Sequence, residues 1–167
     1  ADLITVRGMR LLEQADVIIY AGSLVNPELL AYAKKECEIF NSATMTLSEV
    51  LAVMQQSQEA EKMLVRLHTG DPSIYGAIRE QMDELDRLGI PYESCPGVSA
   101  CFGAAASLNI EYTLPGISQS LIITRRQNEG SNEREYRKFC GASGIHGNLF
   151  KHRHVRGIKP KTDRRRI

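Results

Sequence analysis

The segment Leu67–Gly76 holds the residues whose types and spacing are best suited to bind a small ligand. It reads Leu-His-Thr-Gly-Asp-Pro-Ser-Ile-Tyr-Gly, so that a strand-like run leads into a turn at Gly70. Glycine there lets the backbone approach a ligand closely, and a helix that begins at Pro72 offers unpaired amides to a carboxylate or another polar group. Asp71 either accepts a hydrogen bond from a ligand amine or caps that helix. Because Asp before Pro is a common helix start, the cap is favoured.

Two further turns have the same character, and a histidine lies close to the first. Pro96–Ala100 and Ala21–Leu24 contain small residues that allow a ligand, or simply a neighbouring helix, to approach closely. Helix packing is the simpler interpretation for both. His68 stands at a strand end, where a general base could lie, but no acidic partner is near in sequence. A structural histidine is therefore favoured.

These turns connect predicted helices and strands that alternate over residues 1–124. Short apolar runs predict strands, and amphipathic stretches that begin with a capping residue predict helices. The predicted helices are residues 5–15, 26–35, 46–59, 72–88 and 98–108, and the predicted strands are residues 17–20, 38–40, 63–67, 92–95 and 120–124. Thr46 and Glu49 form a capping box, and Asp83 and Arg87 are spaced to pair. The alternation predicts an α/β fold with a mostly parallel sheet, whose ligands lie beyond the carboxyl ends of the strands.

The charge of the chain changes sign near Arg125. Residues 1–124 hold 8 Lys and Arg against 16 Asp and Glu, a net charge of −8, and residues 125–167 hold 13 against 4, a net charge of +9. Because apolar periodicity also fades there, residues 125–167 are predicted to form a basic tail of low structure. Polybasic tails can bind phosphates, but this one lacks interleaved aromatic residues and the acidic body repels phosphates. Composition therefore argues against nucleic acid as a partner.

The cysteines and the apolar runs limit the cellular compartments in which the protein is expected. No two of the four cysteines form a CxxC pair, no secretion signal opens the chain, and no apolar run reaches membrane-spanning length. A reduced, cytoplasmic protein without a membrane partner is expected. A group of potential ligands in the tail matches no common zinc spacing, so no metal site is predicted; it comprises Cys140, His146, His152 and His154. Dinucleotide, P-loop and nucleophile-elbow motifs are absent from the sequence.

Taken together, six segments resemble the tetrapyrrole methylase family, the S-adenosylmethionine-dependent enzymes of corrin and sirohaem synthesis. They are Asp2–Gly8, Ala15–Tyr20, Thr69–Pro72, Ile90–Tyr92, Pro96–Ala100 and Leu114–Pro115. The likeness spans roughly residues 1–124 and implies the family's N-terminal α/β domain, with a mostly parallel sheet flanked by helices. Within the family, Tyr20–Val25 together with Leu67–Gly76 resembles the branch that methylates C11 of precorrin-4, or of its cobalt form, in cobalamin synthesis.

The resemblance implies a set of ligand contacts. S-adenosylmethionine would contact Thr69, Gly70, Asp71, Ile74, Ser99 and Ala100. The tetrapyrrole would lie near Ser23 and Met45, in turns that hold few basic partners for its carboxylates. No catalytic residue is assigned, because methyl transfer from a sulfonium requires alignment of donor and acceptor rather than a nucleophilic side chain. The acidic residue proposed as a base in the sirohaem branch is replaced here by Ala21.

The sequence departs from the family pattern at both ends. The family begins with a strand and a Gly-rich loop and carries a second α/β domain, and neither is recognisable here. We expect an incomplete N-terminal domain over residues 1–124 and a basic tail over residues 125–167 that an out-of-frame reading would also produce. The alternatives to an active methyltransferase are an inactive fragment and a non-enzymatic module whose tail binds nucleic acid. Full-length members of the family are homodimers.

Overall fold

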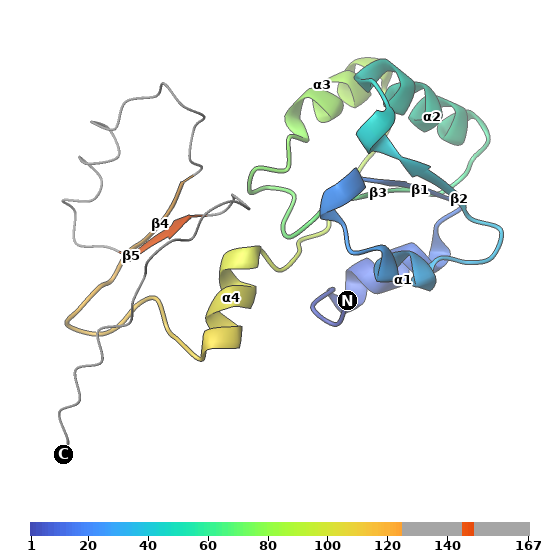
Figure 1. Cartoon of the computed structure of the whole chain (residues 1–167). Helices are drawn as coiled ribbons and strands as arrows, with labels where there is room; N and C mark the ends of the chain where they lie inside the picture. Colours follow the sequence, from blue (N-terminus) through green and yellow to red (C-terminus); the bar gives the residue numbers. More distant parts are fainter. Residues whose placement is uncertain (125–144, 149–167) are drawn as a thin grey trace. The chain divides into compact units, whose positions relative to one another are not determined.

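The computed structural model describes residues 1–124 and 145–148, and these fall into two compact units (Figure 1). The first unit is Ala1–Asn109, and the second begins at Ile110. The first unit contains a parallel sheet with helices on both faces, which confirms the predicted α/β fold. No helix in the described ranges combines the length and apolar character that crossing a membrane requires.

The sheet of the first unit has three parallel strands in the order β2-β1-β3. The central strand β1, Val17–Tyr20, is buried along nearly its whole length, as expected of an apolar run with a strand on each side. Its neighbours are β2, Glu38–Asn41, and β3, Leu64–Leu67. Tyr20 stands opposite both Asn41 and Leu67, so the three carboxyl ends meet at one edge of the sheet.

Two apolar clusters fix the helices to the two faces of the sheet. On one face, helices α2 (Leu47–Glu59) and α3 (Arg79–Leu88) pack against Ile19. On the other face, helix α1 (Val6–Gln14) packs against Ile18. The predicted capping box at the start of α2 is confirmed, since the Glu49 amide donates to Thr46 Oγ1 at 3.3 Å and the Thr46 amide donates to Glu49 Oε2 at 2.7 Å. The remaining elements of this unit are η1 (Gly22–Leu24), η2 (Pro27–Tyr32), η3 (Ser42–Thr44) and α4 (Ala100–Leu108).

The helix predicted over residues 26–35 is the shorter 3₁₀ helix η2, which ends at Tyr32. Asn26 caps it as predicted, because its side chain accepts from the Glu28 amide at 3.0 Å. Leu29, Leu30 and Tyr32 all pack against the α1-face cluster. η2 connects β1 to β2 in the sequence, and its tight turns place these neighbouring residues against the sheet. Short 3₁₀ helices are frequent as connections of this kind.

The helix predicted from Pro72 begins only at Arg79. The prediction was wrong because the backbone of Tyr75 and Ala77 is left-handed, with φ of 57° and 50°, and such residues interrupt a right-handed helix. The intervening Gly76 lies so close to Pro72 that a Cβ there would stand 2.1 Å from the Pro72 carbonyl oxygen. Residues 72–78 are therefore a tight loop rather than the first two turns of α3.

The strand predicted over residues 92–95 and the ion pair predicted between Asp83 and Arg87 are both absent. Residues 91–99 have no regular structure, because the backbone of this segment forms no ladder with β3 or any other strand in the described part of the chain. On α3, Asp83 pairs with Arg79 at 2.7 Å and Arg87 pairs with Glu84 at 2.9 Å. The exposed carboxylates on this helix offered alternative partners at equivalent spacing.

The second unit contains the predicted strand near residues 120–124, here β4, Leu121–Thr124. It pairs in parallel with β5, Ile145–Asn148, with Leu121 opposite Ile145. Four residues of the predicted low-structure tail thus form a strand. The rest of that tail lies outside the described residues, and with it Cys140, His152 and His154 of the group considered for zinc.

Candidate functional site

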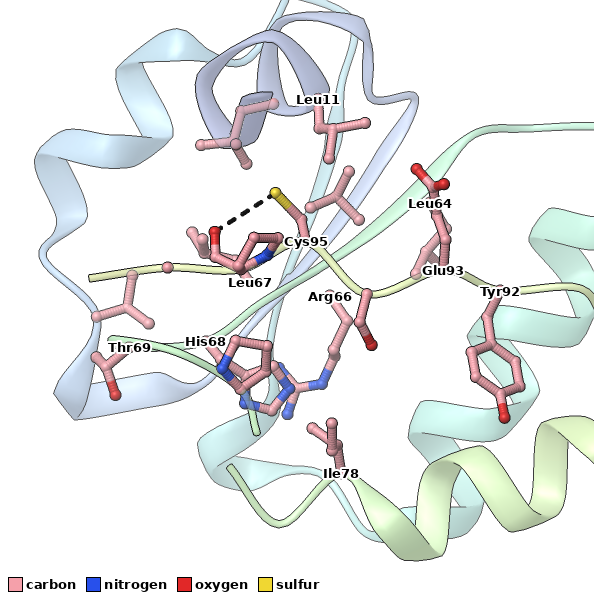
Figure 2. Close-up of a pocket in the computed structure, with 18 of the residues that line it drawn as sticks. Leu11, Leu64, Arg66, Leu67, His68, Thr69, Ile78, Tyr92, Glu93 and Cys95 are labelled. Carbon is pink, nitrogen blue, oxygen red and sulfur yellow. Dashed lines mark hydrogen bonds between the residues drawn. The ribbon is translucent and has the colours of Figure 1, made fainter. Parts of the chain in front are cut away.

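A groove of about 910 Å³ lies beside β3 in the first unit. One wall is β3 with the turn that follows it, and the opposite wall is the irregular segment Tyr92–Val98 (Figure 2). The start of α1 holds that second wall in place, because Arg7 Nη2 pairs with Glu93 Oε1 at 2.9 Å and Thr5 Oγ1 donates to the Pro96 carbonyl at 3.4 Å. The groove therefore opens along the edge of β3 that faces away from β1.

The two turns that resemble the family's cofactor-binding motifs are joined at one end of this groove. The Gly97 amide donates to Asp71 Oδ2 at 3.0 Å, and the Asp71 amide donates to Ser99 Oγ at 3.4 Å. Gly97 lies directly on Gly70, since a Cβ on Gly97 would stand 2.0 Å from the Gly70 carbonyl oxygen. Gly70 itself has φ of 63°, which favours glycine. Two turns that are far apart in the sequence are thus joined, Thr69–Pro72 and Pro96–Ala100. Together they are called the turn pair.

Both oxygens of the Asp71 carboxylate accept hydrogen bonds in this arrangement. Oδ1 accepts from the amide and the hydroxyl of Ser73, and Oδ2 accepts from the Gly97 amide. These hydrogen bonds, that of the Ser73 hydroxyl first, hold the pKa of Asp71 below its ordinary value. The predicted helix cap is wrong, because no helix begins at Pro72; the Asp71 carboxylate instead accepts from Ser73 within the loop and ties the two turns together through Gly97.

The six residues expected to contact the cofactor all lie in or next to this turn pair. Thr69 and Gly70 line the groove. Ser99 is buried beneath Asp71, and Ala100 is the first residue of α4. Ile74 is half-buried in the loop, where its amide donates to the Asp71 carbonyl at 3.1 Å. Four of the six residues lie outside the groove lining: Asp71, Ile74, Ser99 and Ala100.

The two residues expected on the substrate side come from adjoining elements. Ser23 lies in η1, and η1 packs against η3, where a Cβ on Gly22 would stand 2.5 Å from Ala43 Cβ. Met45 follows η3 and packs, half-buried, against the cluster around Ile19. The Met45 side chain therefore belongs to the core beneath α2 rather than to the groove.

Arg66 is a groove residue that the sequence analysis missed. Its guanidinium donates to the Ile19 carbonyl at 3.0 Å, to Ser42 Oγ at 2.9 Å and to Gln81 Oε1 at 3.2 Å. All three acceptors are neutral, and burial lowers the pKa of Arg66. The sequence did contain one signal, an arginine within an otherwise apolar strand. A charged side chain is rarely buried in a strand unless a specific partner compensates for the loss of water.

His68 follows on the same face of the strand, two residues further on, and its environment is also unusual. Its Nε2 atom is buried and has no hydrogen-bond partner among the described residues. Burial, with the nearby positive charge of Arg66, lowers the pKa of His68 to about 4, so the imidazole is neutral at physiological pH. The sequence indicated a structural histidine, yet a satisfied core histidine would have its ring nitrogen paired.

The family model for tetrapyrrole (corrin/porphyrin) methylases matches residues 1–149. That match extends past Thr124, where the likeness visible in the sequence alone ended. The cobalt-precorrin-4 C(11)-methyltransferase of Methanocaldococcus jannaschii is 60% identical over 124 residues, which are 74% of this chain and 48% of that protein. The precorrin-4 C(11)-methyltransferase of Pseudomonas aeruginosa is 48% identical, over 74% of this chain and 49% of that protein.

Solved structures give the same picture. A cobalt precorrin-4 methyltransferase described as a cobalamin biosynthetic enzyme matches with a TM-score of 0.74 and 47% identity, over 77% of this chain and 54% of that one. A uroporphyrin-III C-methyltransferase from Thermus thermophilus, solved with S-adenosyl homocysteine, matches with a TM-score of 0.59 and 26% identity, over 74% of this chain and 50% of that one. The chain spans about half the length of the relatives it matches. With the family model covering most of its residues, the chain belongs to the tetrapyrrole (corrin/porphyrin) methylase family.

Proposed function

We propose that this chain is part of an S-adenosylmethionine-dependent methyltransferase that methylates C11 of precorrin-4, or of its cobalt form, in cobalamin synthesis. The observation that carries the proposal is the turn pair, in which Gly70 and Asp71 are joined to Gly97 and Ser99 beside the groove. The relatives named for this reaction support the same substrate, and the neighbour solved with S-adenosyl homocysteine supports the donor.

The residues of the turn pair would hold and orient the methyl donor. S-adenosylmethionine supplies an activated methyl group, and transfer requires the electron pair of the ring carbon to form the new bond while the sulfur–methyl bond breaks. Alignment of the two reactants can account for about 7–11 kcal/mol of a barrier of this kind. Gly70 and Gly97 allow the ligand close access to the backbone, and Asp71 keeps the two turns at a fixed separation. In this mechanism Thr69 and Ser99 contribute polar contacts, and no side chain acts as nucleophile.

We further propose that residues 1–124 form the N-terminal part of a longer enzyme. The groove supports this, because β3 pairs with a strand on one edge alone within the described residues, while its other edge faces the unpaired segment Tyr92–Val98. One additional parallel strand in that space would pair with both walls.

A homodimer and a cytoplasmic location are the assembly and the setting expected of the full-length enzyme. Size-exclusion chromatography with light scattering measures the first, and cell fractionation measures the second.

The test of the proposed function has two parts. Calorimetric titration of the chain with S-adenosyl homocysteine should give saturable heat, whereas absence of heat at millimolar ligand would contradict a working donor site. Radiolabel from methyl-labelled S-adenosylmethionine should then appear in precorrin-4, with the new methyl group at C11 by NMR. A chain that binds the donor without transferring label would be an inactive fragment, the alternative considered from the sequence.

A further inference from the structure

We propose that Tyr75 is a ligand-contact residue, which places its aromatic ring against a flat, conjugated group of the bound ligand. The proposal rests on the proposed function, since it adds one residue to the ligand site at the turn pair. Tyr75 lies in the loop of residues 72–78, which leads from the turn pair to α3 (Figure 1). It does not line the groove beside β3, so its exposure does not depend on what fills the groove.

The first observation is backbone strain beneath an exposed ring. Tyr75 has φ of 57° and is 44% exposed. A bulky side chain rarely adopts this left-handed conformation, which glycine adopts readily. Tyr75 packs into neither apolar cluster of the first unit, so the core gains little from the ring. Residues held in strained backbone without such a gain are concentrated at ligand sites.

The second observation is that the loop is held firmly to the turn pair. The Ile74 amide donates to the Asp71 carbonyl at 3.1 Å. A Cβ on Gly76 would stand 2.1 Å from the Pro72 carbonyl oxygen, so the loop folds back closely on its own start. The backbone on each side of Tyr75 therefore has a fixed position, and a ligand that meets the ring does not have to order the loop first.

The third observation is which residues of the loop face outward. Ile74 and Ile78 are half-buried, whereas Tyr75 and Ala77 between them are exposed. The loop follows the carboxyl end of β3, and ligands of open parallel sheets bind outside the carboxyl ends of the strands. Tyr75 is thus an exposed aromatic residue beside the turn pair, at the edge of the sheet where a ligand is expected.

The composition of the loop indicates which kind of group Tyr75 meets. Residues 72–78 contain no charged side chain, so the loop offers a carboxylate no counter-ion. A tyrosine ring instead stacks on another flat ring while its hydroxyl group stays in water. Two components of the proposed reaction carry such a ring system: the tetrapyrrole and the adenine of the methyl donor. The shared chemistry is ring stacking, and the experiment separates the two sources.

The experiment measures the ligand affinity and the thermal stability of the whole chain and of three variants. The ligands are uroporphyrin, which supplies a flat tetrapyrrole, and S-adenosyl homocysteine, which supplies adenine. Tyr75→Gly removes the ring and the strain together, whereas Tyr75→Phe keeps the ring. Ala77→Gly is the matched control, because Ala77 has the same left-handed backbone, with φ of 50°, in the same loop and carries no ring.

We expect Tyr75→Gly to weaken the binding of one of the two ligands by about five-fold to a hundred-fold, the range for stacking of an aromatic side chain on a base. Tyr75→Phe should bind within about two-fold of the wild type, because the ring is retained. Ala77→Gly should bind as the wild type does. Both glycine variants should unfold at the temperature of the wild type or a few degrees above it, because each relieves strain.

The NMR resonances of the Tyr75 ring, assigned by their absence from Tyr75→Phe, report the contact directly. A stacked ring lies in the ring current of the ligand, so these resonances should move upfield with the ligand whose affinity falls in Tyr75→Gly. If that ligand is uroporphyrin, Tyr75 meets the tetrapyrrole, and if it is S-adenosyl homocysteine, Tyr75 meets the adenine. A tyrosine with a purely structural role would keep its resonances in place.

The contact is wrong if Tyr75→Gly binds both ligands as the wild type does, or if the Tyr75 resonances stay in place with both ligands. It is also wrong if Ala77→Gly loses as much affinity as Tyr75→Gly, since the conformation of the loop would then support binding without the ring. A clearly lower unfolding temperature of Tyr75→Gly would indicate a packing role and contradict it as well.

Failure of the contact and failure of the proposed function give different results. A wild-type chain that binds neither ligand would contradict the contact and the donor site together. A wild-type chain that binds S-adenosyl homocysteine and transfers methyl groups, while Tyr75→Gly does both equally well and binds uroporphyrin as tightly, would contradict the contact and leave the proposed function intact.

Discussion

The central strand β1 and the edge strand β3 differ in how tightly they are packed and in the polar groups that lie beside them. β1 has a strand on both sides, and Ile18 and Ile19 in it are fully buried. β3 has a strand partner on the β1 side, and all four of its residues are only half-buried where they border the groove. The β1 side is a core in which the strand pairs with β2 on one side and β3 on the other. The β3 side keeps a charged guanidinium, an unpaired imidazole nitrogen and a loop with left-handed backbone at Tyr75 and Ala77, the features that accompany ligand sites.

The region around β1 is called the packed side and the region around β3 the groove side. The largest expected effect comes from shortening one apolar side chain to alanine on each side. Ile18 and Leu67 belong to the same apolar cluster on the α1 face, but Ile18 is 0% exposed and Leu67 is half-buried at the groove. Ile18→Ala should lower the free energy of unfolding by about 2–5 kcal/mol, because it leaves a cavity in a filled core. Leu67→Ala should lower it by about half as much, since part of that side chain already borders open space.

Urea unfolding followed by circular dichroism measures both variants, with equal m-values as the check that the unfolded states are alike. An equal loss for the two variants would mean that the groove side is packed as tightly as β1. The contrast between the two edges would then be wrong.

The next effect concerns the turn pair. Gly97→Ala places a methyl group 2.0 Å from the Gly70 carbonyl oxygen, a backbone atom that cannot move without moving the whole turn. The expected cost is about 1–3 kcal/mol of stability, together with loss of measurable binding of S-adenosyl homocysteine. Gly103→Ala is the control, because a Cβ there meets Leu3 Cδ1 at an ordinary 3.5 Å.

Gly103 lies inside α4, where alanine is favoured over glycine by about 0.5–1 kcal/mol, so the control should be as stable as the wild type or slightly more stable. Thermal unfolding and calorimetric titration of the two variants give the comparison. If Gly97→Ala binds the ligand normally, the close contact between the two turns is not needed for the donor site.

The unequal success of sequence-based prediction follows the same division. The strand Val17–Tyr20 and the capping box at Thr46 and Glu49 are local patterns, and the structure contains both at the expected positions. The helix predicted from Pro72 failed because Gly76 and its left-handed neighbours form a tight loop there, which local propensity does not report. The contact of Gly97 with Gly70 depends on tertiary structure alone.

The site residues divide in the same way. The motif around Gly70 and Asp71 was identifiable because it resembles a family pattern, but its carboxylate was found to bind Gly97, which no spacing rule predicts. Arg66 and His68 went unassigned because a strand gives the alternation of its side chains and not what surrounds them. The partial burial of both side chains and the missing hydrogen-bond partner of His68 Nε2 became visible only in three dimensions.

A smaller effect is the pH dependence that His68 gives to stability. In the unfolded chain His68 takes up a proton near pH 6.5, whereas in the folded chain it does so near pH 4. Between these values the unfolded chain binds more protons, so the free energy of unfolding falls as pH decreases from about 6.5 toward 4 and is unaffected above. Allowing for partial access of the imidazole to solvent, the fall should be roughly 1–2 kcal/mol.

Urea unfolding of the wild type and His68→Gln at pH 7.5, 5.5 and 4.5 measures this dependence. Asp16, Glu49 and Asp71 have lowered pKa values, and their contributions are present above their unfolded values near 4 and are lost as pH falls further. Both proteins share those contributions, so their difference isolates His68. Parallel pH profiles would show that the imidazole is solvated and not part of a dry groove wall.

The smallest expected effect on stability comes from removing the N-cap of α2, a local feature on the packed side. Thr46 caps α2 through its hydroxyl, and Glu49 completes the box on the same exposed turn. Thr46→Ala should lower the free energy of unfolding by about 1 kcal/mol, the usual value of an N-cap, and should leave the affinity for S-adenosyl homocysteine unchanged. Ser48→Ala, at an exposed position in the first turn of the same helix, is the control for a lost hydroxyl without a capping role. A loss of ligand affinity in Thr46→Ala would mean that the packed side and the groove side are energetically coupled, because a change confined to the start of α2 would then reach the turn pair on the other side of β1.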